Sequence, residues 1–258
     1  MTPFSVFNLN IMHGRNRRSA VFPPFVGREE IQDNLKKIID CIHFNNPDIV
    51  TLQEVDEGSV FSGSFNQFEF IKEKLGYPYA YFASTCVGKL IGKNVFVTGN
   101  TIFSRYPLEN RESFKFNFSF PTDRMGFVIA DIKLPEGRIL TVVSAHLVYL
   151  DWTRPHSRKS QLDIVRKAVE ARGNSVMIAG DFNCDFLGKE DSLRSFVSQL
   201  HLKVFEPDGE NMNTYPSWNP FKRIDYILPS RGLDLVSYKT PSDIVSDHLA
   251  VFAKFSMR

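Results

Sequence analysis

The chain has 258 residues, with 31 basic and 29 acidic side chains and a formal net charge of +2. It is 43% hydrophobic and contains 24 phenylalanines. This composition excludes an intrinsically disordered chain, and the near-neutral charge excludes a polybasic nucleic-acid binder while leaving room for a local basic patch. The length suits one large domain. Because no linker or low-complexity tract interrupts the sequence, we expect a single domain over residues 1–258.

Short runs rich in Val, Ile and Phe alternate with stretches of helical period, which predicts an α/β fold. In chain order the pattern predicts a strand at 4–11, a helix at 29–44, a strand at 48–53, a helix at 65–75, strands near 79–84, 94–104, 112–119, 126–133 and 139–145, a helix at 155–171, a strand at 175–180, a helix at 192–200, and strands near 223–228, 233–239 and 249–255. The connections between 79 and 145 are too short for parallel crossovers, so we expect this block to be antiparallel.

Three features bear on the cellular setting. The three cysteines are scattered and form no Cys-x-x-Cys pair, which predicts neither a disulfide framework nor a structural zinc site. No apolar run approaches the roughly 18 residues of a membrane span, and the N-terminus lacks the pattern of a signal peptide. We therefore expect a cytoplasmic protein. The sequence is silent on oligomeric state, for which a monomer is the default expectation.

Polar residues stand at the ends of several predicted strands. These residues are Glu54, His146, Asp181 with Asn183 two positions later, Asp225, and the pair Asp247-His248. Taken singly, each has a plain structural explanation as a helix cap, an Asx-turn or a core histidine. Because sites in α/β sheets form beyond strand ends, the repetition favours one shared site.

Crowded carboxylates need a cation to offset their mutual repulsion. A ligand set rich in oxygen and free of cysteine favours Mg²⁺, with Mn²⁺ as the alternative, over zinc. The sequence therefore predicts a magnesium site.

Six motifs carry a family resemblance. They are Asn8-Leu9-Asn10-Ile11, Leu52-Gln53-Glu54-Val55, Ser144-Ala145-His146-Leu147, Gly180-Asp181-Phe182-Asn183, Arg223-Ile224-Asp225-Tyr226 and Ser246-Asp247-His248. In this order they resemble the endonuclease/exonuclease/phosphatase superfamily, which includes pancreatic deoxyribonuclease, neutral sphingomyelinases, inositol-polyphosphate phosphatases and abasic-site endonucleases. The resemblance runs from about residue 4 to residue 255. It implies a four-layer sandwich of two mixed, mostly antiparallel sheets with helices outside, and Mg²⁺-dependent phosphoester hydrolysis, most directly of phosphodiesters.

The resemblance also implies roles for individual residues. Glu54 would be the principal metal ligand, with Asn10 and Asp247 completing or flanking the metal shell. Asp181 would orient and deprotonate the attacking water, and His146 would protonate the leaving oxygen. The remaining two would stabilise the developing charge: Asn183 through its amide, and His248 as a cation held by Asp225.

At some positions the sequence departs from the motifs of particular family members, and these differences narrow the choice of substrate class. Abasic-site endonucleases carry a basic residue after the Gln-Glu pair, where this chain has Asp56, and lack a histidine at the position of His146. Inositol-polyphosphate phosphatases carry Trp-Cys-Asp-Arg where this chain has Ile224-Asp225-Tyr226. Among the members considered, the sequence is most similar to the sphingomyelinases and deoxyribonucleases, together with bacterial hydrolases of unassigned substrate. The expected substrate is a nucleic acid, a phospholipid head group or a small phosphodiester.

Candidate substrate contacts lie in basic loops that follow two of the strands. Arg15 belongs to one loop, Arg154 and Arg158 belong to another, and Trp218 could stack on a base, sugar or head group. Solvated surface charge and a core tryptophan are the plain alternatives. Phe114, Phe116, Phe118 and Phe120 alternate with polar residues, which indicates a strand with one buried face or an exposed ridge for a lipid.

Two alternative functions stay open. The first is a phosphomonoesterase that acts on inositol phosphates or phosphoinositides. The second, of a different class, is a catalytically silent scaffold that binds a phospholipid or a protein. A silent member would be expected to have lost a metal-binding residue or the residue that acts as the base, and this chain has every one.

Overall fold

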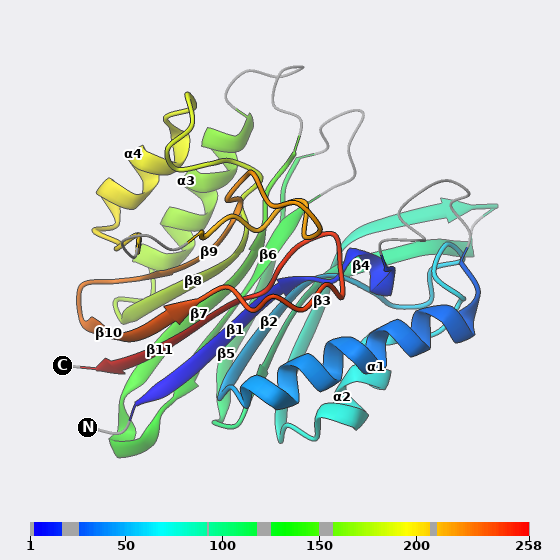
Figure 1. Ribbon diagram of the computed structural model, residues 1–258. Helices are drawn as coiled ribbons and strands as arrows, with labels where there is room; N and C mark the ends of the chain where they lie inside the picture. Colours follow the sequence, from blue (N-terminus) through cyan, green and yellow to red (C-terminus); the bar gives the residue numbers. More distant parts are fainter. Residues whose placement is uncertain are drawn as a thin grey trace.

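The computed structural model describes residues 3–16, 26–91, 93–117, 125–149, 157–206 and 211–257. In these parts of the chain, two sheets pack face to face and helices cover both outer faces (Figure 1). The six-stranded sheet has the order β10 (Leu233–Lys239), β11 (Val251–Met257), β1 (Phe4–Asn10), β2 (Ile49–Asp56), β4 (Lys93–Ser104), β3 (Tyr79–Leu90). The five-stranded sheet has the order β5 (Leu108–Lys115), β6 (Gly126–Lys133), β7 (Ile139–His146), β8 (Ser175–Asp181), β9 (Asp225–Pro229).

Both sheets are mixed and mostly antiparallel. The strands β1 and β2 run parallel, as do β7 and β8, while the other paired strands are antiparallel. The predicted four-layer α/β sandwich is therefore confirmed, and so is the antiparallel arrangement of the strands between residues 79 and 145.

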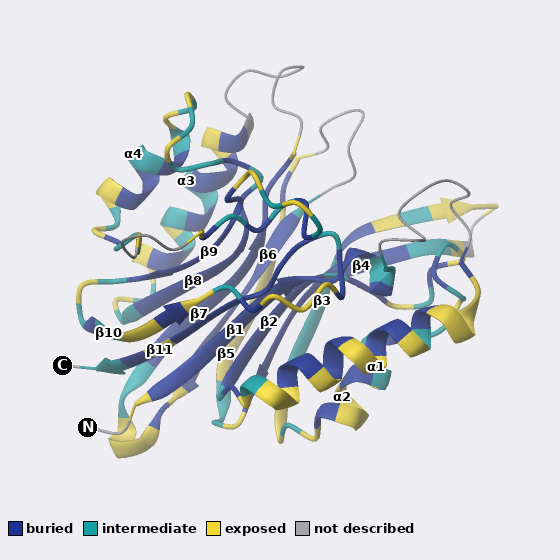
Figure 2. Cartoon of the chain, in the orientation of Figure 1, coloured by how far each residue is buried: buried dark blue, intermediate teal, exposed yellow. Residues whose placement is uncertain are grey.

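The helices are amphipathic and bury one face each. Helices α1 (Arg28–Asn45) and α2 (Gln67–Leu75) cover the six-stranded sheet, and α3 (Ser157–Glu170) and α4 (Ser192–Gln199) cover the other. Along α1 the side chains of Ile31, Leu35, Ile38 and Ile42 are fully buried, while the opposite face is exposed (Figure 2). A third cluster of apolar side chains fills the space between the two sheets.

The bounds of two strands differ from the prediction, because exposed side chains in them break the alternation of apolar and polar residues. β3 continues to Leu90 as one arm of a long hairpin, of which Val87 and Leu90 are exposed. β5 begins at Leu108, and its first half is charged and exposed because it forms the edge of its sheet.

The phenylalanine stripe is core where the structure describes it. Phe114 stacks on Phe127 with ring centroids 4.6 Å apart, and Phe116 is only 2% exposed. Phe118 and Phe120 lie outside the described residues. The alternative of an exposed lipid-binding ridge is therefore wrong for the described half of the stripe.

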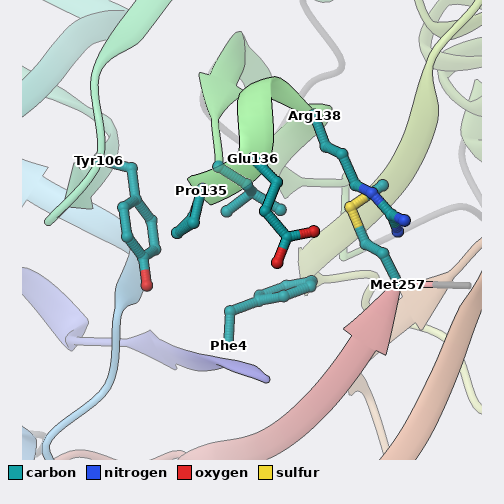
Figure 3. A pocket seen from close by; sticks show the side chains of 7 residues that line it. Phe4, Tyr106, Pro135, Glu136, Arg138 and Met257 are labelled. Atoms are coloured by element: carbon teal, nitrogen blue, oxygen red, sulfur yellow. The ribbon is translucent and has the colours of Figure 1, made fainter. Parts of the chain in front are cut away.

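A small hollow lies where β1 starts and β11 ends, near the 3-10 turn η2 (Pro135–Gly137) (Figure 3). It has a volume of about 20 Å³ and is lined by Phe4, Tyr106 and Met257 among other residues. A space of this size holds about one water molecule. Within the described ranges, no helix is long and apolar enough to cross a membrane.

Candidate active site

The ends of four strands meet at the other end of the sandwich. β1 and β2 belong to one sheet, β7 and β8 belong to the other, and they face each other across the interior. Register brings the polar residues together, since His146 pairs with Asp181 and Asp181 pairs with Asp225. Asn10 links the two sheets at this site, because its Nδ2 donates to Glu54 Oε1 and to Asp181 Oδ2, each at 3.1 Å.

Glu54 projects from a bulge in β2. The pairing of β2 with β4 shifts register between Leu52 and Val55, and Glu54 has a left-handed φ of 55°. A bulge of this kind redirects a side chain away from strict alternation. Burial opposes ionisation of Glu54, yet the neighbouring His13 and His146 outweigh it and lower the pKa of the carboxyl. Glu54 is therefore held as a carboxylate, with its side chain 21% exposed.

Asp181 is an almost completely buried carboxylate that faces this group. Its Oδ2 lies 3.5 Å from His146 Nε2 and 3.7 Å from His248 Nε2, and its Oδ1 accepts the backbone N–H of Asn183 at 2.9 Å. Burial, reinforced by the charge of Asp225, raises the pKa of Asp181 despite the two histidines. A raised pKa makes this carboxylate a stronger base than an exposed one.

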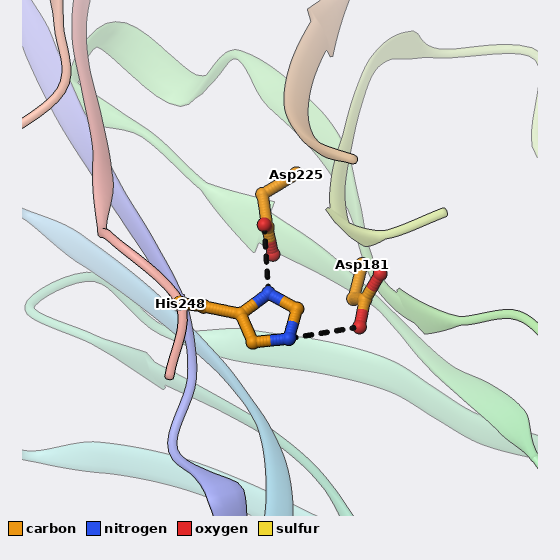
Figure 4. Close-up of side chains that lie close together, drawn as sticks. All are labelled: Asp181, Asp225 and His248. Carbon is orange, nitrogen blue, oxygen red and sulfur yellow. Dashed lines mark hydrogen bonds and ion pairs between the residues drawn. The ribbon is translucent and has the colours of Figure 1, made fainter. Parts of the chain in front are cut away.

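His248 and Asp225 form a buried pair (Figure 4). His248 Nδ1 lies 2.8 Å from Asp225 Oδ2, so the opposite nitrogen, Nε2, is directed toward Asp181. Burial lowers the pKa of His248, but the charges of Asp225, Asp181 and Asp247 outweigh it and hold that pKa well above its ordinary value. These charges therefore favour the cationic form of the imidazole.

The residues Asp181, Asp225 and His248 offer ligand atoms within 4.8 Å of one another. Because His248 Nδ1 is engaged by Asp225, these atoms make a hydrogen-bonded chain more readily than an open set of metal ligands. The carboxylates of Glu54 and Asp247 are about one-fifth exposed, at 21% and 20%, and are better placed for a cation that arrives from solvent.

Asp247, a predicted metal ligand, and Asn183, a predicted catalytic residue, complete the predicted site. Burial, followed by the charge of Glu54, raises the pKa of Asp247 although His248 opposes it. Asn183 has a left-handed φ of 51° and donates through Nδ2 to the carbonyl of Leu147 at 2.9 Å. An amide NH₂ has two hydrogens, so a second donor is left on Asn183.

Sequence reasoning missed His13, which lies in the 3-10 turn η1 (Met12–Gly14) after β1. Its Nε2 is 3.2 Å from Glu54 Oε2, and its Nδ1 is 2.8 Å from Asp56 Oδ1. Burial lowers the pKa of His13, but Asp56 and Glu54 raise it to about 9. The only signal in the sequence was a histidine shortly after a strand that ends in a predicted site residue.

The residues predicted to contact the substrate differ in their burial and contacts. Arg15 is half-buried and donates through Nη2 to the carbonyl of Phe61 at 3.0 Å, while Arg154 lies outside the described residues. Trp218 is partly buried beside Ser217, whose N–H donates to the carbonyl of Asp247 at 2.7 Å. The turn that carries Trp218 is thus tied to the segment that carries Asp247.

Arg158 is buried, whereas the prediction placed it in a basic loop that faces the substrate. It is 4% exposed, its Nε and Nη2 donate to the carbonyl of Val148 at 3.2 and 3.1 Å, and it also pairs with Glu190. The predicted solvent-facing position of Arg158 is therefore corrected: its guanidinium is buried and supports the loop that follows His146.

We expect Arg158→Ala to reduce the free energy of unfolding by about 1–3 kcal/mol, because it leaves buried carbonyls without a donor. Urea denaturation of both proteins measures this change. Lys159→Ala is the matched control, because Lys159 is the next residue on α3 and is exposed. Equal stability of the Arg158→Ala and Lys159→Ala variants would contradict the structural role.

Comparison with known proteins gives one consistent result. The family model described as "Endonuclease/Exonuclease/phosphatase family" matches residues 10–248. The Escherichia coli K12 protein YbhP is 25% identical over 207 residues, which are 75% of this chain and 76% of YbhP.

Solved structures share the fold. An endonuclease/exonuclease/phosphatase protein from Beutenbergia cavernae superposes with a TM-score of 0.76 at 21% identity, over 100% of this chain and 72% of that one. A mannosyl-6-phosphatase from Bacteroides thetaiotaomicron superposes with a TM-score of 0.71 at 16% identity, over 98% of this chain and 100% of that one.

Proposed function

Because this chain belongs to the endonuclease/exonuclease/phosphatase family, we propose that it is a metal-dependent hydrolase of phosphoester bonds, with a preference for phosphodiesters. The observation that carries the proposal is the bridge made by Asn10, which places the proposed metal ligand Glu54 beside the proposed base Asp181. His146 Nε2 lies 3.8 Å from Glu54 Oε1 and 3.5 Å from Asp181 Oδ2, and His248 Nε2 lies 3.7 Å from Asp181 Oδ2.

The donor set fits Mg²⁺, with Mn²⁺ as the alternative, because it is made of carboxylates and contains no thiolate. Glu54 would be the principal ligand and Asp247 the second, since both are partly exposed. Asn10 directs its NH₂ toward Glu54 and Asp181, while its Oδ1 accepts the N–H of Met12 at 3.0 Å. In this orientation Asn10 flanks the metal shell and aligns the carboxylates. When bound, the metal would polarise the phosphoryl group as a Lewis acid.

Asp181 is proposed to orient the attacking water and accept its proton. Its Oδ1 is fixed by the N–H of Asn183, and its Oδ2 faces the group of polar side chains between the two sheets. The raised pKa supports the role of base, because proton transfer is most effective when the base titrates closer to the working pH.

The two histidines have separate proposed roles. His248, kept cationic by Asp225, donates through Nε2 to a non-bridging oxygen as negative charge develops, and the second hydrogen of Asn183 does the same. His146 donates a proton to the leaving oxygen. His146 Nε2 lies 3.5 Å from Asp181 Oδ2, so acid and base stand beside each other in the free enzyme.

Two further groups are proposed to contact the substrate. Trp218 belongs to the turn that is tied to Asp247, and Arg15 follows the strand that carries Asn10. A cation and an aromatic ring would suit a phosphate joined to a base, a sugar or a lipid head group.

A phosphoester panel tests the proposal. It includes bis-p-nitrophenyl phosphate, p-nitrophenyl phosphate, single- and double-stranded DNA, sphingomyelin, inositol phosphates and mannose 6-phosphate. We expect hydrolysis that EDTA abolishes and Mg²⁺ restores, with diesters cleaved faster than monoesters. Faster cleavage of monoesters would favour a phosphomonoesterase, the activity for which the Bacteroides neighbour is named. A Mg²⁺-loaded protein inert on the whole panel would overturn the proposal and favour a silent scaffold.

A further inference from the structure

His13 lies between two carboxylates at the edge of the proposed active site. Its Nε2 is 3.2 Å from Glu54 Oε2 and its Nδ1 is 2.8 Å from Asp56 Oδ1. The Asp56 side chain is fully buried, whereas the His13 and Glu54 side chains are 23% and 21% exposed. The three groups therefore form a line that runs from the interior toward the site.

His13 contacts only one of the two carboxylate oxygens of Glu54, and the other oxygen faces the proposed site. His13 contacts Oε2, while Oε1 lies 3.1 Å from Asn10 Nδ2 and 3.8 Å from His146 Nε2, at the centre of the proposed site. A donor that occupies one oxygen of a carboxylate fixes the rotation of the whole group. Glu54 is thereby set to offer a single oxygen to a cation.

The turn that carries His13 has an unusual backbone conformation that depends on a glycine. Met12, His13 and Gly14 have left-handed φ angles of 47°, 55° and 74°. A Cβ on Gly14 would come within 2.9 Å of Ile31 Cγ2, so only glycine fits beneath the turn.

One side chain locks the turn to β2. Gln67 Nε2 donates to the carbonyl of His13 at 2.7 Å, and Gln67 Oε1 accepts the N–H of Asp56 at 3.1 Å. Asp56 Oδ2 in turn accepts a hydrogen bond from Ser62. Each polar atom that sets the position of His13 is thus satisfied, which is typical of a support that orients a functional group.

We propose that His13 is a positioning residue, held by Asp56, that orients Glu54 so that one carboxylate oxygen is presented to the metal. The inference rests on the proposed function, because it requires a metal at Glu54. His13 itself contacts neither metal nor substrate in this account. It acts through Glu54, so the main effect of its loss is on the affinity of the protein for the metal.

A pair of nearly isosteric variants separates this role from simple packing. His13→Met removes the donor and keeps a side chain of similar bulk, while His13→Gln keeps an N–H of similar reach. We expect His13→Met to bind Mg²⁺ about 10- to 100-fold more weakly than the wild type, the usual loss when a support of a metal ligand is removed. His13→Gln is expected to restore most of the affinity. Isothermal titration calorimetry of metal-free protein measures both, and His43→Met on the exposed face of α1 is the control.

The outcomes distinguish this inference from the proposed function. A wild-type protein that does not bind Mg²⁺ would overturn the proposed function. Wild-type binding with unchanged affinity in His13→Met, or with equal losses in the Met and Gln variants, would overturn only the role of His13. If His13→Met does not fold, Asp56→Asn decides, because it keeps the side-chain size and removes the charge that holds Nδ1. It is expected to weaken Mg²⁺ binding, and unchanged binding would overturn the inference.

Discussion

Replacing Asp181 with asparagine is expected to lower the rate of phosphoester hydrolysis by about 10²- to 10⁴-fold, the usual loss when a positioned proton-transfer group is removed. Asp181 is 1% exposed, and its Oδ2 lies 3.1 Å from Asn10 Nδ2. Asparagine preserves the size of the side chain but cannot accept a proton from water at neutral pH. The measurement is kcat for bis-p-nitrophenyl phosphate at saturating Mg²⁺.

Asp185→Asn is the matched control, because Asp185 lies on the same loop and its Oδ1 accepts the local N–H of Leu187, at 3.0 Å. We expect it to keep nearly all of the activity. Circular dichroism and thermal unfolding show whether the Asp181→Asn variant is folded. Wild-type activity in that folded variant would exclude Asp181 as the base.

Asp225→Asn is expected to have the second large effect, because it removes the charge that keeps His248 protonated. Burial lowers the pKa of His248, and Asp225 is the largest of the charges that raise it above the ordinary value. Without Asp225 that pKa falls, so the cation is lost at a lower pH than in the wild type. Loss of one donor to the developing charge typically reduces the rate by about 10²- to 10³-fold.

The pH profile gives the sign of this effect. His248 is protonated below its pKa, so the alkaline decline of kcat/KM should move toward lower pH in Asp225→Asn. Activity should be closest to wild type at the acidic end of the range. Measurement of kcat/KM from about pH 5 to pH 9 follows the shift. An alkaline limb that stays in place would show that His248 does not act as a cation held by Asp225.

The layers of the fold and the main site residues could be predicted because both depend on short-range patterns. Val, Ile and Phe runs mark the buried strands, and Glu54, His146 and Asp181 each follow such a run. Parallel strands that end at one edge bring such residues together, so the position of a residue along a strand was enough to place it.

His13 could not be predicted in the same way. It lies in a turn with left-handed backbone angles, which has no periodicity, and its contact with Glu54 depends on a bulge in β2. Arg158 was misplaced for a related reason. A basic residue near a basic loop is usually solvated, and its burial here depends on the path of the chain at Val148 and Tyr149.

The dependence of hydrolysis on Mg²⁺ tests the central claim most directly. Metal-stripped wild-type protein and Glu54→Gln are compared in the rate of bis-p-nitrophenyl phosphate cleavage while Mg²⁺ is added. The account predicts no rate in EDTA, a saturable rise with Mg²⁺ in the wild type, and little or no rise in Glu54→Gln at the same concentrations. A rate that ignores Mg²⁺, or a Glu54→Gln variant that responds to Mg²⁺ as the wild type does, would contradict it.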